Sequence, residues 1–153
     1  MGALNLALKL IRALEGLRLT AYWDAYGKRW TVGFGHTGPD VHEGLTITLV
    51  QALAFAARDM APLYQLVKDR PMLEGAALIS FGYNCGEGAL KRVLSGEIVV
   101  NDEEFWAPES QTNHMLVVYG ERSGGSLLEA LQARRNLEAS LIELSRSMAL
   151  KAA

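Results

Sequence analysis

The chain has 153 residues, of which 50% are hydrophobic and 21% charged, and its formal net charge is −2. This length and apolar content suit one compact domain with its own core. The small negative charge argues against a basic surface for nucleic acid. Cys85, the single cysteine, excludes an intrachain disulfide and fits folding in a reducing cytoplasm.

The first predicted element is an amphipathic helix over residues 4–14. Its apolar residues at helical spacing are Leu4, Ala7, Leu8, Ile11 and Leu14. Gly16 follows as a natural stop. The stretch is too short to span a bilayer, which needs about 20 apolar residues, and no signal-peptide cleavage site follows it. We therefore expect no stable membrane insertion.

A β-rich region is predicted next, over about residues 17–40. Aromatic and β-branched side chains gather there around several glycines, a composition typical of strands and tight turns. The pattern predicts a small antiparallel hairpin or three-stranded sheet. Asp24 and Thr31 would lie close together on two of its strands, facing Glu15 at the end of the first helix.

The remainder of the chain is predicted to be mainly helical. Thr48 and Gln51 have capping-box spacing and open a helix whose core face is Ala52, Ala56, Met60 and Leu63. Pro71 starts a helix that ends near residues 84–86, a shorter helix covers about 87–95, and a last one covers about 126–148. Residues 99–125 give no clear pattern. We expect an α+β fold in a single domain over residues 1–153.

Two carboxyl groups, Glu15 at the end of the first predicted helix and Asp24 in the β-rich region, are candidates for acid–base chemistry. A glycosidase needs one protonated carboxyl and one ionised carboxylate. The negative end of the helix dipole and apolar neighbours are expected to raise the pKa of Glu15. Asp24, on a polar hairpin, is expected to stay ionised. The sequence therefore predicts Glu15 as the proton donor.

Strand alternation assigns the neighbouring residues to two faces. Thr31, Gly33 and Gly35 share one face, whereas Val32, Phe34 and His36 share the other. Thr31 would then face the cleft, and the two glycines would let a bulky sugar chain approach the backbone. His36 would point away from the cleft.

Three blocks of the sequence resemble the phage-type lysozymes, glycoside hydrolase family 24. Residues 15–38 resemble the family signature, residues 77–86 continue the similarity, and Arg134-Arg135 with Glu138 resembles an Arg-Arg-x-x-Glu helix. The resemblance implies a lysozyme-like fold. It also implies hydrolysis, with inversion, of the β-1,4 bond between N-acetylmuramic acid and N-acetylglucosamine in peptidoglycan, with no cofactor and no metal.

The resemblance also implies roles for individual residues. Glu15 would be the general acid, while Asp24 and Thr31 would position and activate water. Gly33, Gly35 and Asn84 are further candidates for substrate contact. The sequence departs from the family in having one more residue between Asp24 and Thr31, which we expect the turn to absorb, and residues 97–122 match the family poorly.

Structural roles compete with several of these functional interpretations. Asp24 could cap its turn, Thr31 could serve the strand, and Asn84 could end its helix. For His36 and for Cys85, a structural histidine and a buried thiol are favoured. Donor atoms on the loop at Asp40, His42 and Glu43 match no metal spacing and indicate a solvated loop.

The biological setting follows from the resemblance. We expect a monomeric endolysin that is made in the host cytoplasm, acts on peptidoglycan and depends on a holin that permeabilises the membrane. One alternative is a catalytically weak peptidoglycan-binding or virion-structural protein on a lysozyme scaffold. Another is a lytic transglycosylase, which would leave 1,6-anhydro ends.

Overall fold

The first helix ends where a glycine permits a left-handed turn. The computed structural model describes residues 2–25, 27–106 and 127–153. Helix α1 (Ala3–Leu14) buries Ala7 and Ile11, and Glu15 closes it with a backbone N–H that donates to Ile11. Gly16 follows with φ 75°, a conformation that costs glycine little. The predicted helix and its stop are confirmed.

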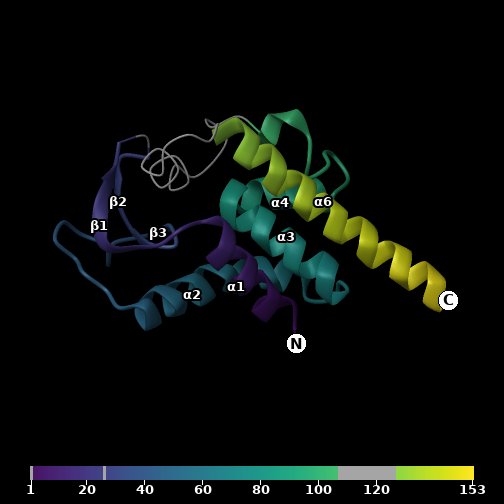
Figure 1. The fold of residues 1–153 in the computed structure, drawn as a ribbon, viewed down its shortest axis with the longest axis horizontal. Helices are drawn as coiled ribbons and strands as arrows, with labels where there is room; N and C mark the ends of the chain where they lie inside the picture. Colours follow the sequence, from purple (N-terminus) through teal and green to yellow (C-terminus); the bar gives the residue numbers. More distant parts are fainter. Residues whose placement is uncertain (1, 26, 107–126) are drawn as a thin grey trace.

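A three-stranded antiparallel sheet follows, as predicted, and lies at one end of the molecule (Figure 1). Its strands are β1 (Arg18–Asp24), β2 (Arg29–Gly33) and β3 (His36–Thr37), in that order. Tyr22 faces Thr31 across the first strand pair, and Asp24 faces Arg29 at its end. The regular register near the turn fixes which side chains share a face.

Most of the predicted helices are confirmed within two residues. Thr48 and Gln51 form the expected capping box at the start of α2 (Leu49–Val67). Pro71 precedes α3 (Met72–Cys85), and α4 (Glu87–Leu94) follows directly. The last helix, α6 (Leu127–Ala152), begins close to its predicted start and runs four residues past its predicted end. A short 3-10 turn, η1 (Glu103–Phe105), is the described structure in the region without a clear pattern.

Helix α3 lies inside the helical part of the molecule, with α1, α2, α4 and α6 around it (Figure 1). Ten of its fourteen residues are buried, which explains why its sequence is apolar on all sides. The four predicted core residues of α2, Ala52, Ala56, Met60 and Leu63, are all buried. None of the described helices is long and apolar enough to cross a membrane.

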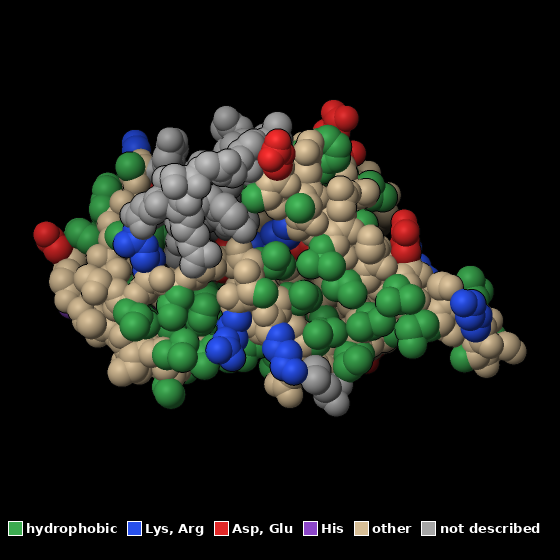
Figure 2. All heavy atoms as spheres, in the orientation of Figure 1, with side chains coloured by type: hydrophobic (Ala, Val, Ile, Leu, Met, Phe, Trp, Pro, Cys, Tyr) green, Lys and Arg blue, Asp and Glu red, His purple; other side chains and the backbone are tan. Residues whose placement is uncertain are grey.

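Figure 2 shows acidic and basic side chains scattered over the visible face, in keeping with the small net charge. Helix α6 buries Leu131 but exposes Leu137 and Leu144. Its buried face instead carries Arg134, Arg135 and Glu138, so charges occupy part of its interior face.

Candidate active site

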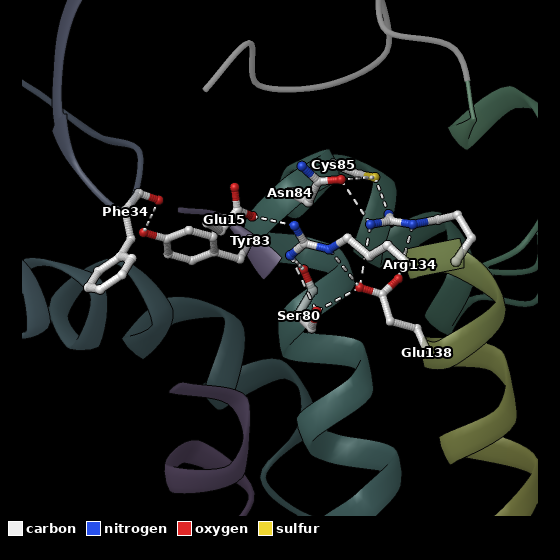
Figure 3. A network of polar contacts seen from close by, with 9 residues as sticks. Glu15, Phe34, Ser80, Tyr83, Asn84, Cys85, Arg134 and Glu138 are labelled. Atoms are coloured by element: carbon white, nitrogen blue, oxygen red, sulfur yellow. Dashed lines mark hydrogen bonds and ion pairs between the residues drawn. The ribbon is translucent and has the colours of Figure 1, made fainter. Parts of the chain in front are cut away.

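The two carboxylate oxygens of Glu15 differ in their hydrogen bonding. Its side chain is 1% exposed, and Oε1 accepts a hydrogen bond from Arg134 Nη1 at 2.5 Å. The other oxygen, Oε2, has no hydrogen-bond partner among the described residues. Figure 3 shows this carboxyl group beside the Tyr83 ring, with a dashed line to the guanidinium group of Arg134. One oxygen is therefore fixed by a cation, and the other makes no hydrogen bond within the described part of the chain.

Asp24 lies at the last paired position of β1, where the hairpin turns. Its Oδ1 accepts the backbone N–H of Gly27 at 3.0 Å, so it does cap the turn, as the structural alternative holds. Asp24 pairs with Arg29 and Tyr22 pairs with Thr31, so the strand pairing is regular up to the turn. That the turn absorbs the extra residue stays a prediction.

Thr31 lies opposite Tyr22 and is 2% exposed. Its hydroxyl has no partner in hydrogen-bond geometry among the described residues. Asp24 is two positions beyond Tyr22 on the same strand, so its side chain and those of Tyr22 and Thr31 belong to one face of the hairpin. The predicted closeness of Asp24 and Thr31 thus agrees with the observed register.

Tyr22 links this face to Glu15, and the sequence interpretation did not single it out. Burial raises the pKa of the Tyr22 hydroxyl above its usual value, and the nearby charges of Asp24 and Glu15 raise it further. The guanidinium of Arg18 lies 5.5 Å from the ring centre and acts in the opposite direction. Both proposed carboxyl groups are therefore electrostatic neighbours of the same tyrosine.

Arg134 is a second residue that contacts this site and to which the sequence analysis assigned no individual role. It is 1% exposed, and its guanidinium group also donates to Ser80 and Glu138. It places a cation against Glu15, in addition to the helix end and the apolar neighbours, and a cation stabilises an ionised carboxylate. The available signal was the Arg-Arg-x-x-Glu spacing, which places Arg134 and Glu138 one helical turn apart.

The geometric reason given for Gly33 is wrong. Gly33 has φ 68°, and a Cβ atom there would lie 3.4 Å from the Ala52 side chain of α2. The backbone leaves the regular strand at this residue, so its open side faces a helix and not a cleft. Asn84 is fully buried and accepts a hydrogen bond from Arg135 at 2.8 Å. Substrate contact at Gly35 stays a prediction.

His36 takes part in contacts away from Glu15, in agreement with its predicted direction. Its ring nitrogens lie 2.7 Å from Asp59 Oδ2 and 3.1 Å from Asp40 Oδ1. The ring also stacks on Phe55 of α2 at 4.3 Å. Over the described part of the chain, no group of three or more histidine, cysteine or acidic side chains is arranged to hold a metal ion.

A cavity of about 370 Å³ lies elsewhere, between α3, α4 and α6. Its described lining includes Glu74 and Arg146 but none of Glu15, Asp24 and Thr31. Glu74 is 5% exposed and accepts hydrogen bonds from Arg70 at 3.2 Å and from Arg146 at 3.3 Å. This buried carboxylate provides a natural comparison for Glu15.

Solved structures resemble this chain over nearly its whole length. The muramidase domain of SpmX from Asticcacaulis excentricus aligns with a TM-score of 0.60 and 28% identity, covering 89% of this chain and 93% of that one. The endolysin of Escherichia coli O157:H7 phage FAHEc1 aligns with a TM-score of 0.62 and 25% identity, covering 93% of each chain. The expected lysozyme-like α+β fold is confirmed.

Sequence relatives point to the same family. An endolysin of Bacillus phage B103 is 33% identical over 140 residues, or 88% of this chain and 51% of the relative. An endolysin of Lactococcus phage c2 is 33% identical over 145 residues, or 88% of this chain and 57% of the relative. The chain thus spans about half the length of these curated relatives. The phage lysozyme family model matches residues 12–138, and the chain therefore belongs to the phage lysozyme family.

Proposed function

We propose that this chain is a glycoside hydrolase that cleaves the β-1,4 bond between N-acetylmuramic acid and N-acetylglucosamine in bacterial peptidoglycan. The observation that carries the proposal is the state of Glu15. One of its oxygens is held by Arg134, and the other has no hydrogen-bond partner among the described residues. Family membership supports the reaction type, and the names of the endolysin and muramidase relatives support the substrate.

The proposed reaction begins with proton transfer from Glu15. In its protonated form, Oε2 donates to the glycosidic oxygen as the bond to the sugar breaks. The carboxylate of Asp24 and the hydroxyl of Thr31 hold a water molecule, which attacks the anomeric carbon and gives its proton to Asp24. We expect inversion at this carbon, because the water would enter from the face opposite the leaving oxygen.

The substitution Glu15→Gln tests the role of the proton donor. Glutamine keeps the shape of the side chain but cannot donate a carboxyl proton, so release of reducing sugar from purified peptidoglycan should fall at least about 100-fold. Glu74→Gln is the matched control, because it changes another buried, arginine-bound glutamate, in the first turn of α3. It should keep its activity. Circular dichroism checks that both variants are folded.

The same assay separates the alternatives. A catalytically weak wall-binding protein would sediment with peptidoglycan but release no reducing sugar, even as the unchanged chain. A role as an endolysin also predicts that the chain clears permeabilised cells and leaves intact cells turbid. Dependence on a holin, synthesis in the host cytoplasm and a monomeric state remain predictions, and the comparison of intact with permeabilised cells tests the first of them.

A further inference from the structure

Five buried side chains form a charge cluster behind the free oxygen of Glu15. The members of this buried charge cluster are Glu15, Ser80, Arg134, Arg135 and Glu138, each no more than 1% exposed. They come from the end of α1, from α3 and from α6, and Figure 3 shows Glu15, Ser80, Arg134 and Glu138 next to one another. Buried charges are expensive unless they are paired, so the pairing within the cluster determines the charge that Glu15 experiences.

Arg134 is fixed on three sides within this cluster. Its Nη1 donates to Glu15, its Nε donates to Glu138 Oε1 at 3.2 Å, and its Nη2 donates to the Ser80 carbonyl at 3.0 Å. The Ser80 hydroxyl donates to the same Glu138 oxygen at 2.6 Å. Glu138 and Ser80 therefore orient the guanidinium group that binds Glu15.

Glu138 also serves the second arginine. Arg135 Nε lies 3.1 Å from Glu138 Oε2 in an ion pair. The other partners of Arg135 are the neutral groups of Asn84, at 2.8 Å, and Cys85, at 2.6 Å. Burial raises the pKa of the Cys85 thiol to about 11, so it stays uncharged near neutral pH. Among the described residues, Glu138 is the anion that contacts Arg135.

The cluster therefore holds two guanidinium groups and two carboxyl groups. If Glu138 were neutral, Glu15 would be the one carboxylate left to balance two positive charges in this buried cluster. Positive charge in a medium of low dielectric constant favours the ionised carboxylate, which cannot donate a proton. A general acid bound to arginine thus needs a second anion that offsets the surplus positive charge.

We propose that Glu138 is a positioning residue, which aims Arg134 at Glu15 and offsets the charge of Arg135 so that Glu15 can carry its proton. This inference rests on the proposed function of Glu15. It assigns to the Arg-Arg-x-x-Glu segment a part in proton donation, beyond packing α6 against α3.

Other titratable groups near Glu15 are unchanged in the variants considered below. Tyr83 of α3 and Tyr22 of β1 both feel the charge of Glu15, and burial raises the pKa of each. Both hydroxyls therefore stay neutral through the assay range. Asp24 and Arg18 are the charged groups on β1 that face Tyr22. A shift in the pH profile of a variant can then be attributed to the substituted charge on α6.

Two opposite substitutions test the inference through the pH dependence of activity. Glu138→Gln should move the alkaline limb of the rate profile about one pH unit lower, because surplus positive charge favours ionised Glu15. Arg135→Gln should move it in the other direction. The double variant removes one charge of each sign, so its limb should return toward that of the unchanged chain, although it has fewer contacts.

The return in the double variant separates charge balance from mere structural support. A structural role would make the double variant at least as impaired as either single variant. Glu74→Gln, which breaks a different contact between α3 and α6, should lower stability without moving the limb. If Glu138→Gln does not fold, the Arg135→Gln variant alone tests the inference. A shift of its alkaline limb to higher pH supports charge balance, and any other result contradicts it.

Two results have distinct meanings. The role of Glu138 would be overturned if the alkaline limb of the rate profile did not move in either single variant. It would also be overturned if the limb of the double variant did not return toward that of the unchanged chain. Either result would leave the proposed function intact. Retained activity in Glu15→Gln would instead remove the proposed function. The titration midpoint of the Glu15 carboxyl group, followed by carbon NMR, should move in parallel with the rate profile and gives a readout independent of turnover.

Discussion

At the scale of single residues, the proposed chemistry depends on side chains whose directions are fixed by close contacts. The Asp24 carboxylate, which packs closely against Gly27, is a clear example. A Cβ atom at Gly27 would lie 2.5 Å from Asp24 Oδ2 and 2.7 Å from Arg29 Nε. Contacts this short cannot be accommodated without movement of the carboxylate. An alanine here would therefore force the Asp24 carboxylate or a neighbouring group to shift.

The variant Gly27→Ala should therefore lose activity through Asp24. A displacement of about 1 Å at a catalytic group can reduce a rate on the order of 100-fold, and we expect a loss of about 10- to 100-fold in peptidoglycan hydrolysis. Gly88→Ala is the control, since nothing lies within 4 Å of its added methyl group in α4. Equal activity in both variants would show that the Asp24 position is unimportant.

Sequence reasoning found the residues that carry the proposed chemistry but not those that surround them. Glu15, Asp24 and Thr31 are recognisable because they lie in one short segment with defined helix and hairpin signals. Arg134 and Glu138 are distant in the chain from Glu15, and nothing local shows that α6 brings them to it. Gly33 was assigned to the wrong face because regular alternation was assumed for the last residue of β2, which has φ 68°.

At the scale of elements, the sheet is joined to α2 through His36. Burial lowers the pKa of this histidine, but the hydrogen bonds and charges of Asp59 and Asp40 outweigh burial and raise it above 6.5. The folded chain thus binds a proton at His36 more tightly than the unfolded chain does. This contribution to stability is fully present below about pH 6.5 and is lost as the pH rises through the raised value.

The difference in unfolding free energy between the unchanged chain and His36→Gln should accordingly shrink as the pH rises from 6 toward 9. Urea denaturation at several pH values measures it. His42→Gln is the control, because it removes an exposed histidine of the following loop. It shows how much the loss of a histidine without these partners changes the pH dependence of the unfolding free energy. A difference that stays constant over this range would contradict the assigned ion pairs.

Element boundaries were predictable where a local signal exists. The capping box at Thr48, Pro71 before α3 and Gly16 after α1 each leave a mark in the sequence. The interior face of α6 was not predictable, because its leucine spacing suggests an apolar face while the structure buries arginine and glutamate there. Only the partners on α1 and α3 make that burial tolerable.

At the scale of the whole molecule, a buried hydroxyl connects the helical part to the sheet region. Tyr83 of α3 donates to the carbonyl of Phe34, between β2 and β3, at 3.1 Å (Figure 3). Burial raises the pKa of Tyr83 well above its usual value, so it remains a donor throughout the neutral range. The bond holds the β2–β3 turn against the helix that carries Ser80.

Tyr83→Phe should lower the free energy of unfolding by about 1 kcal/mol, the usual loss for one hydrogen bond whose acceptor stays buried. Denaturant unfolding at pH 5 and pH 8 should give the same loss, because the hydroxyl does not titrate between them. A loss confined to one of these pH values would show that a charged group, and not this bond, is responsible.

The most direct test of the account is mass spectrometry of peptidoglycan digested by the chain. Hydrolysis at the proposed bond predicts products that end in reducing N-acetylmuramic acid, each carrying the elements of one added water, and none of these above background with Glu15→Gln. Products ending in reducing N-acetylglucosamine, or 1,6-anhydro products lighter by one water, would contradict it.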